Sequence, residues 1–470
     1  MLFPTIDFAV FFTVVLVLSW FVPAFGTSWK LLILAASYVF YGWWDPRFCL
    51  LLAATTVINQ AAARLIVRSQ GRRRVALVAA AVTVDLGVLG YFKYAGFFAS
   101  SLVNALGSVG LNPPLPLLQV ALPVGISFFT FQAISYVVDV HRRVIEPGRN
   151  LDVAVFLAFF PHVVAGPIVR ASEFLPQLRP NRWARRIDAT QALWLIVGGL
   201  FKKVVLASYL ATNIVDPVFA VPSAHSSGEV LVAIYAYAVQ IWADFSGYTD
   251  IAIGVALLLG IRFPQNFNAP YTAASFQDFW RRWHMTLSRW LRDYLYIPLG
   301  GNRGRRGAVA RNLMITMVLG GLWHGAAWTF VIWGALHGTY LVVERFGRSW
   351  RQRRNLGPLP MSWLWSRLIV FNLVCLAWVF FRADSMTTAF TLLDRLVTAP
   401  GPAPLVTPLV LLAVAAGIGV QYVPRDLGAR LVARLSELGP VLQGAGVAAA
   451  FAVIGALGPQ GVAPFIYYRF

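Results

Sequence analysis

Apolar stretches of about 20 residues recur along the whole chain, and this pattern restricts its fold more than any other feature. A helix needs roughly 20 apolar residues to cross the hydrocarbon core of a bilayer. Only 12% of the residues are charged, whereas soluble proteins carry about 25%. A single soluble core cannot bury so much apolar surface. The sequence therefore predicts an all-α polytopic membrane protein with about 11–12 transmembrane helices.

The predicted spans follow one another without an internal repeat or a low-complexity linker, which indicates one membrane domain over residues 1–470. The stretch from Met1 to Val22 lacks a basic n-region and a cleavage site, so it is predicted to be the first span. The spans are expected near 5–24, 28–43, 48–67, 75–92, 119–139, 188–211, 229–259, 312–328, 330–343, 362–382, 405–421 and 440–458.

The formal net charge of +20 comes from arginines that cluster between the apolar stretches. This distribution favours orientation in a membrane over binding of nucleic acid, because short cytoplasmic loops are rich in Lys and Arg. The rule places loops 72–74, 142–149 and 179–186 inside and loop 93–118 outside. Both termini are then predicted to be extracytoplasmic.

Segment 150–168 has basic loops on both sides, which a simple span cannot explain. We expect a re-entrant hairpin that is broken at His162, Gly166 and Pro167. Such a backbone is tolerated at membrane depth only against protein or a wet cavity.

His324 lies between Gly320-Gly321 and Gly325 in an apolar stretch, and ionisable groups at such positions are functional by default. The flanking glycines would allow a substrate to approach the imidazole, which can act as a general base near neutral pH. The alternative is a core histidine that bonds a backbone carbonyl.

A second histidine, His284, lies within the stretch Asp278–Tyr296. Apolar residues recur there at spacings of three and four, which predicts an amphipathic helix at the cytoplasmic surface with His284 on its apolar face. Arg281 and Arg282 fall on the other face and could meet an anionic cofactor such as the phosphates of coenzyme A. The alternative is a histidine that only packs beside tryptophans.

Asp244 and Asp250 also lie inside a long apolar span and need partners, for which Lys202 and Lys203 are candidates. We interpret both carboxylates as members of a structural network. Histidines without a Ser-His-Asp spacing, a nucleophile elbow or a metal cluster favour direct acyl transfer to a hydroxyl. A proton-coupled transporter with Asp244 and Asp250 in its relay is the alternative.

Eight short motifs carry a family resemblance that covers nearly the whole chain. They are Leu122–Gln132, Phe160-Pro161 with Ala165–Ile168, Asp244–Gly247, Phe267-Asn268 with Pro270-Tyr271, Phe279–His284, Tyr294–Gly301, Leu322–Gly325 and Trp378–Arg382. In this order they resemble the membrane-bound O-acyltransferases, in the branch that contains alginate O-acetylation proteins and D-alanyl teichoic acid transferases.

The resemblance implies a ring of spans around a thin central region, with a catalytic core at about 119–382 and C-terminal spans and an aromatic tail at about 405–470. The invariant histidine of the family falls on His324 and its second important histidine on His284. The implied donor is acetyl-coenzyme A taken from the cytoplasm, or a carrier-protein thioester in the D-alanyl branch, with no permanently bound cofactor. Donor binding is predicted for Arg281, Arg282, Trp283 and Asn268.

The resemblance also implies a multi-pass protein of the bacterial inner membrane that O-acylates a surface or secreted polysaccharide. Its expected partners are membrane lipid and an extracytoplasmic SGNH-type acyltransferase or polysaccharide synthase. The chain ends in an aromatic tail with Tyr467 and Tyr468. A similar tail ends a small partner protein of the D-alanyl system, so Tyr467 is predicted to relay the acyl group. An interfacial aromatic anchor is the alternative.

Overall fold

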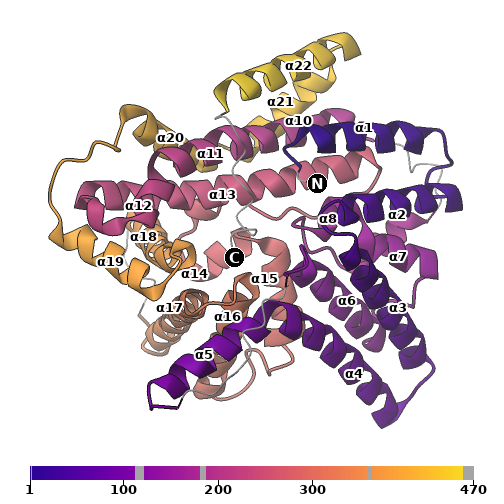
Figure 1. Cartoon of the computed structure of the whole chain (residues 1–470), viewed down its shortest axis with the longest axis horizontal. Coiled ribbons are helices and arrows are strands. Elements are labelled where there is room, and N and C mark those ends of the chain that lie inside the picture. The colour runs from indigo at the N-terminus through magenta and orange to yellow at the C-terminus, as the bar shows by residue number, and fades with distance from the viewer. Residues whose placement is uncertain (2, 112–120, 180–186, 357–362, 459–470) are drawn as a thin grey trace. The chain divides into compact units, whose positions relative to one another are not determined.

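The computed structural model describes residues 1, 3–111, 121–179, 187–356 and 363–458 (Figure 1). The described residues form helices joined by loops, with no strand among them, which confirms the predicted all-α polytopic class. The chain divides into two compact units. Unit 1 comprises Met1–Ala189 with Val255–Pro264, and unit 2 comprises Thr190–Gly254 with Gln265–Phe470.

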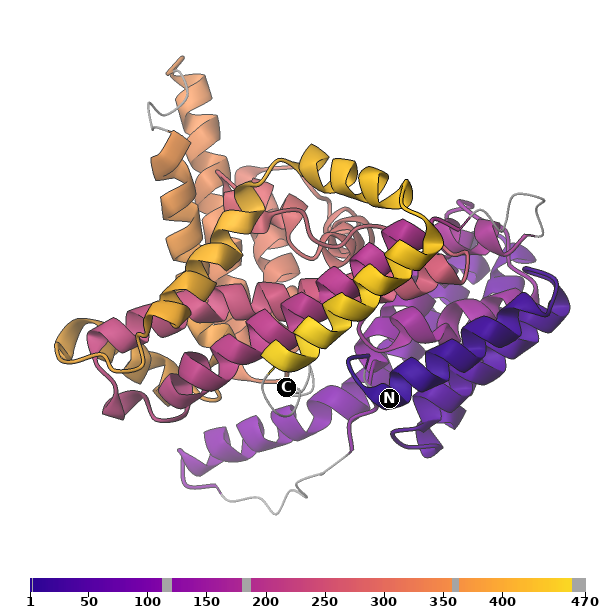
Figure 2. The ribbon, with the colours of Figure 1, turned by 90° about the horizontal axis from the view of Figure 1, so that it is seen from above.

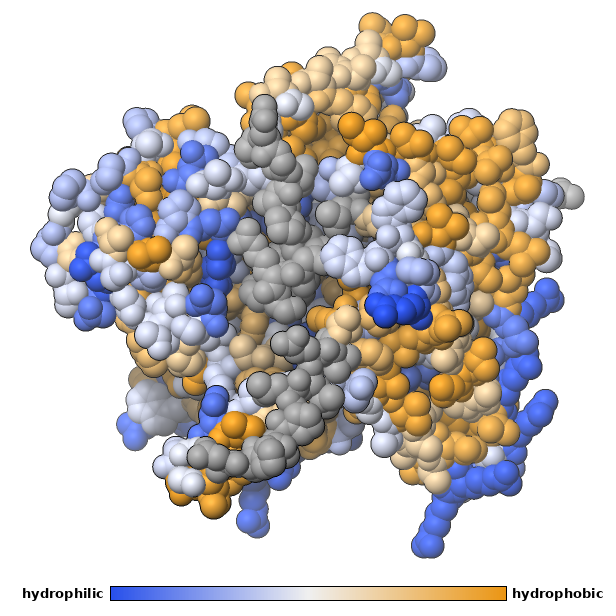
Figure 3. Space-filling model, viewed as in Figure 1, coloured by the Kyte–Doolittle hydropathy of each residue, from blue (hydrophilic) through white to orange (hydrophobic). Residues whose placement is uncertain are grey.

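Unit 1 exposes apolar side chains on its outer helices, as a surface in contact with lipid should. Ile6, Val10 and Leu31 are more than half exposed, and Figure 3 shows apolar atoms over α1 and α2. The elements of unit 1 are α1 Ile6–Trp20, α2 Thr27–Gly42, α3 Arg47–Val67, α4 Gly71–Leu89, η1 Gly90–Tyr94, α5 Ala95–Gly107, α6 Ile126–His141, α7 Asn150–Ala158, α8 Phe160–Val163, α9 Ala171–Phe174 and η2 Leu175–Leu178.

The predicted outer loop 93–118 is wrong over most of its described length. A π-turn, η1, follows α4, and α5 continues the helix to Gly107. A glycine inside a helix costs only about 1 kcal/mol relative to alanine, so Gly90 and Gly96 do not end it. The apolar residues between them outweigh that cost.

Segment 150–168 is interrupted near Gly166 and Pro167, as predicted, and also earlier, before His162. The backbone leaves the helical region at Phe159, and His162 lies inside the short helix α8. Pro161 explains the break, because its ring would collide with the carbonyl of Leu157 in a continuous helix. Gly166 does lie at a tight turn, since a Cβ there would come within 2.6 Å of the His162 Cα. The re-entrant course in a membrane stays a prediction.

Unit 2 is built around α13, a helix of 32 residues that is the most buried of the candidate membrane spans. The C-terminal helix α22 runs beside α10 (Figure 2), where Thr190 donates a hydrogen bond of 3.1 Å to the Gln443 side chain. The elements of unit 2 are α10 Ala189–Leu200, η3 Phe201–Ala207, α11 Ser208–Leu210, η4 Ala211–Val215, α12 Asp216–Ala220, η5 Pro222–Ala224, α13 Ser227–Leu258, η6 Pro270–Thr272, α14 Phe276–Arg282, α15 Met285–Leu291, η7 Arg292–Tyr296, α16 Arg306–His324, α17 Trp328–Arg353, α18 Trp363–Arg382, α19 Met386–Thr398, α20 Pro408–Gly419, η8 Val420–Tyr422, α21 Arg425–Ser436 and α22 Pro440–Leu457.

Helices α10 and α13 approach closely because two glycines face each other. A Cβ on Gly199 or on Gly247 would lie 2.6 Å from the other residue's carbonyl oxygen. Small residues at such a crossing allow two membrane helices to come into backbone contact. The crossing lies directly before the lysines of η3.

Six helices in the described part of the chain are long and apolar enough to cross a membrane, or up to seven if one bent pair is a single span. Helix α1, with 15 residues, is a shorter apolar helix. The other spans expected from the sequence fall on shorter or more polar helices, such as α17. The count of about 11–12 and the ring arrangement stay predictions.

Candidate active site

The predicted continuous helix over Asp278–Tyr296 is wrong, because the chain breaks at the histidine it was expected to carry. Helix α14 ends at Arg282, Trp283 is extended, and α15 begins at Met285. His284 lies between the two helices with a φ of 39°, in the left-handed region that non-glycine residues rarely adopt. Backbone strain of this kind persists only where surrounding contacts enforce it.

Asn266 provides those contacts. Its backbone oxygen accepts a hydrogen bond of 2.8 Å from the amide of Met285. Its side-chain oxygen accepts hydrogen bonds from the amide and the hydroxyl of Thr286, at 3.2 Å and 2.9 Å. The same oxygen lies 3.1 Å from Nδ1 of His284. Asn266 therefore caps the start of α15 and orients the imidazole.

His284 is fully buried among aromatic rings. The ring of Phe245 stands edge-on to it at a centroid distance of 4.6 Å, and Trp323 lies at 5.8 Å. Burial lowers the pKa of His284 to about 3, so its imidazole is neutral at physiological pH. Nε2 of His284 has no hydrogen-bond partner within the described parts of the chain.

His324 lies at the last position of α16 and is also buried. Its ring contacts Trp323, Trp333 and Phe381 at centroid distances of 5.0, 5.1 and 5.1 Å. The His324 and His284 rings are 6.3 Å apart. The structure thus brings the two predicted histidines together, and we call them the histidine pair.

Helices α16 and α17 form a tight hairpin that places His324. A Cβ on Gly321 would overlap the carbonyl oxygen of Phe330, and a Cβ on Gly334 would overlap that of Met317. Two glycines at facing positions therefore set the separation of the helices. Since His324 ends α16 and Trp333 lies on α17, this separation also sets the contact between their rings.

A third histidine, His337, is fully buried on α17 beside the pair. Its ring lies 4.8 Å from that of Trp333 and 5.9 Å from that of Phe279. Neither ring nitrogen has a hydrogen-bond partner among the residues that the structure describes. These contacts show that His337 is closely packed among aromatic side chains.

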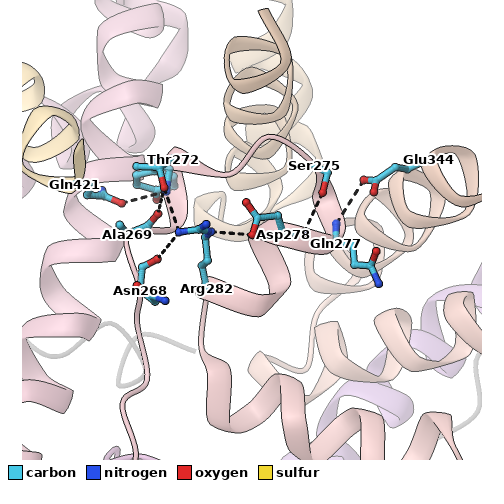
Figure 4. Close-up of polar contacts among 10 residues, drawn as sticks. Asn268, Ala269, Thr272, Ser275, Gln277, Asp278, Arg282, Glu344 and Gln421 are labelled. Carbon is cyan, nitrogen blue, oxygen red and sulfur yellow. Dashed lines mark hydrogen bonds and ion pairs between the residues drawn. The ribbon is translucent and has the colours of Figure 1, made fainter. Parts of the chain in front are cut away.

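The four residues predicted to bind the donor have different surroundings. Arg282 donates to Asp278 at 2.8 Å and reaches the Asn268 carbonyl at 3.5 Å and the Thr272 hydroxyl at 3.4 Å (Figure 4). Arg281 is exposed, Asn268 is partly exposed, and Trp283 is buried, with its ring 4.9 Å from that of Trp378. Arg282 therefore braces loop 268–272 against α14, and Arg281 keeps the more accessible guanidinium.

Helix α14 is anchored at its other end by α17. The carboxylate of Glu344 accepts the amides of Phe276 and Gln277 at 2.5 Å and 3.4 Å, and Ser275 caps Asp278 at 3.1 Å (Figure 4). A carboxylate at a helix N-terminus is favourable, because it satisfies free N–H groups and opposes the helix dipole. The helix that leads into His284 is thus fixed at both ends.

The two carboxylates of α13, Asp244 buried and Asp250 partly exposed, are paired with the predicted lysines. Lys203 forms an ion pair with Asp244, and Lys202 forms one with Asp250 and also donates to Ser246 at 3.1 Å. The close crossing at Gly199 and Gly247 brings η3 near enough for both contacts. These pairs support the interpretation of the carboxylates as structural.

Reasoning from the sequence missed Asn266, which lies 18 residues before His284. It also missed the contacts of Phe245 with the His284 ring and of Trp333 with the His324 ring. The only local signal was the run of turn-forming residues around Asn266, which predicts a loop but no partner. Tyr467 and Tyr468 lie outside the described residues.

Comparison with known proteins places this site in a chemical context. The model of the membrane-bound O-acyltransferase family, MBOAT, matches residues 126–383, which include both members of the histidine pair. A probable alginate O-acetylase of Azotobacter vinelandii is 46% identical over 367 residues, covering 77% of this chain and 71% of that protein.

Two further relatives have different named activities. The peptidoglycan O-acetyltransferase of Helicobacter pylori is 38% identical over 405 residues, covering 80% of this chain and 74% of that protein. The teichoic acid D-alanyltransferase of Streptococcus thermophilus is 31% identical over 288 residues, covering 55% of this chain and 68% of that protein. The similarity to the two O-acetylating relatives is thus both stronger and more extensive.

Proposed function

The chain belongs to the membrane-bound O-acyltransferase family, and from this premise we propose that it moves an acetyl group from a cytoplasmic thioester to a polysaccharide outside the membrane. It is a multi-pass membrane protein and an O-acyltransferase. The observation that carries the finer proposal is the histidine pair: two buried imidazoles 6.3 Å apart, enclosed by aromatic side chains.

In the proposed reaction His324 is the general base. It takes the proton of the acceptor hydroxyl while the hydroxyl oxygen attacks the thioester carbonyl carbon. The tetrahedral intermediate collapses, the C–S bond breaks, and the thiolate leaves with the proton that His324 returns. His284 either orients the thioester or stabilises the charge that develops on its oxygen.

The proposed donor is acetyl-coenzyme A, bound as a substrate and not as a permanent cofactor. Arg281 is the residue best placed to meet a phosphate, because its guanidinium is exposed whereas Arg282 is held by Asp278. We assign Arg282, Trp283 and Asn268 to the support of the donor site. A D-alanyl carrier-protein donor is the second candidate, and the lower similarity to the D-alanyltransferase counts against it.

The polysaccharide is proposed to be alginate-like or another surface glycan, because the named relatives act on alginate and peptidoglycan. These relatives come from bacteria, which supports the bacterial inner membrane as the location. The catalytic core is proposed to span about 119–382 within one functional domain, an extent close to the family match at 126–383. Tyr467 is proposed to accept the acetyl group and pass it to an SGNH-type transferase or a polysaccharide synthase.

The proposal is tested by measuring thiol release from acetyl-coenzyme A by the purified protein in proteoliposomes, with bacterial surface polysaccharide as acceptor. His324→Ala should abolish release without unfolding the protein. His225→Ala is the matched control, because His225 contacts Glu229 and lies outside the histidine pair. Normal release by His324→Ala would overturn the assignment. Activity only with a D-alanyl carrier protein would favour the second donor.

The role of Tyr467 needs its own test. Tyr467→Phe should lower both thiol release by the membrane protein and acetylation of the polysaccharide in cells, because the hydroxyl that accepts the acetyl group is missing. Tyr468→Phe is the neighbouring control. Full acetylation in the Tyr467→Phe strain would refute the relay and favour the alternative, that the tail is an interfacial aromatic anchor.

A further inference from the structure

The proposed function allows two roles for His284, and the choice depends on which ring nitrogen carries the proton. Nδ1 of His284 faces the side-chain oxygen of Asn266 at 3.1 Å. Nε2 points to no hydrogen-bonding atom of the described residues. Whether Nδ1 carries the proton therefore decides whether Nε2 donates or accepts a hydrogen bond with a substrate.

The identity of the Asn266 atom is fixed by its other contacts. An amide side chain can be turned so that its oxygen and nitrogen exchange places. Here the backbone amide of Thr286 lies 3.2 Å from the Asn266 side-chain atom that also faces His284. A backbone N–H can only donate a hydrogen bond, so this atom must accept one. The atom must be the oxygen, so Nδ1 of His284 must carry a hydrogen in order to bond it.

Burial and backbone contacts hold the Asn266 and His284 side chains in this arrangement. Asn266 is 1% exposed and His284 is 0% exposed. The backbone of Asn266 also holds the amide of Met285, so both ends of this asparagine bind the start of α15. The opposite tautomer would place the lone pair of Nδ1 against an oxygen 3.1 Å away, too close for a water to lie between them.

We propose that Asn266 is a positioning residue that holds His284 in the Nδ1–H tautomer, so that Nε2 accepts a hydrogen bond from an O–H or N–H of a bound substrate. In this form Nε2 cannot donate to the thioester oxygen. Of the two roles for His284, stabilisation of the oxyanion is excluded and orientation of a substrate remains. This inference rests on the proposed function for its consequence, but not for the tautomer itself.

The tautomer can be measured directly by nitrogen NMR of histidine-labelled protein in lipid nanodiscs. The chain has six histidines, and His284→Gln identifies the signal that belongs to His284. The expected spectrum shows a protonated Nδ1 and an unprotonated Nε2. Asn266→Ala should shift this signal toward a mixture of tautomers. A wild-type His284 protonated at Nε2 would overturn the proposal.

The consequence for catalysis is measured on the same variants. Asn266→Ala should lower kcat about 10- to 100-fold, the range typical when the partner that orients a metal-binding imidazole is removed. Asn312→Ala is the matched control, because Asn312 is equally buried and bonds the Gly301 carbonyl instead of a histidine. An equal loss of kcat in both variants at equal folded yield would contradict a specific role for Asn266.

Asn266→Asp separates positioning from folding. The carboxylate keeps the acceptor but adds a negative charge, which raises the pKa of His284. Because the neutral imidazole is required, the acidic limb of the pH–rate profile should move to higher pH. A purely structural asparagine would lower the amount of folded protein and leave that limb in place. Failure of His324→Ala to abolish activity would refute the proposed function and leave the tautomer result standing.

Discussion

The close crossing of α16 and α17 predicts a large effect for the small substitution Gly334→Ala. The added Cβ would overlap the carbonyl oxygen of Met317 and lie 2.9 Å from the Cα of Val318. Both neighbours are backbone atoms, so no side-chain rotation can relieve the contact. The helices must separate, and with them the rings of Trp333 and His324, which are 5.1 Å apart in the native hairpin.

The size of the effect follows from the distances. An ordinary contact begins near 3.4 Å, so the contact to Val318 must lengthen from 2.9 Å by at least 0.5 Å, and the shorter contact to the Met317 carbonyl oxygen must lengthen by more. Overpacking of this kind costs about 1–3 kcal/mol of unfolding free energy. Misplacing a catalytic group by about 1 Å can cost about 100-fold in rate, so a shift of at least half that size predicts a loss of at least about tenfold.

The matched control is Gly347→Ala on the same helix, where a Cβ would meet nothing within 4 Å. Alanine favours a helix by up to about 1 kcal/mol over glycine, so this variant should be neutral or stabilised. Thermal unfolding in nanodiscs and thiol release from acetyl-coenzyme A compare the two. Equal melting temperatures and equal rates for Gly334→Ala and Gly347→Ala would refute the argument from close packing.

Three further sets of substitutions test other contacts in unit 2. Lys203→Met should destabilise the protein by about 3–5 kcal/mol, because it leaves Asp244 buried without this ion pair. Adding Asp244→Leu should recover most of the loss in melting temperature. A double variant whose loss is the sum of the two single losses would contradict this prediction. Arg282→Ala should lower the melting temperature. Arg281→Ala should leave the melting temperature unchanged and raise the KM for acetyl-coenzyme A. The reverse pattern would show that Arg281 supports the fold and Arg282 meets the donor. Glu344→Gln should cost about 0.3–2 kcal/mol in thermal unfolding through the N-terminus of α14, and an unchanged melting temperature would exclude that anchor.

The sequence was sufficient to predict the fold class and the pairing of buried charges in outline. Long apolar stretches have one physical explanation, and a buried carboxylate needs a cation, so Lys202 and Lys203 could be named as candidates in advance. Which lysine meets which aspartate could not be predicted, because it depends on the glycine crossing of α10 and α13. That crossing joins residues 48 positions apart, as Gly199 and Gly247 show.

The histidine pair illustrates the same limit at the site. His324 and His284 could be selected from their apolar surroundings and from the family resemblance. The helical period across His284 predicted a continuous helix, because period alone does not register a capping group from elsewhere in the chain. Asn266 supplies that cap from the preceding loop and turns His284 out of the helix. The loop predicted at 93–118 was wrong because the distribution of charges between spans does not show where a helix ends, and here it continues through η1 and α5 to Gly107.

The central claim is that His284 and His324 act as one unit in acyl transfer, and a double-mutant comparison tests it most directly. Acetyl transfer rates are measured for His284→Ala, His324→Ala and the double variant at equal folded yield. Groups that act as a unit are strongly non-additive, so the double variant should be no slower than the slower single variant. Losses that multiply in the double variant, or a single variant with the wild-type rate, would contradict the account.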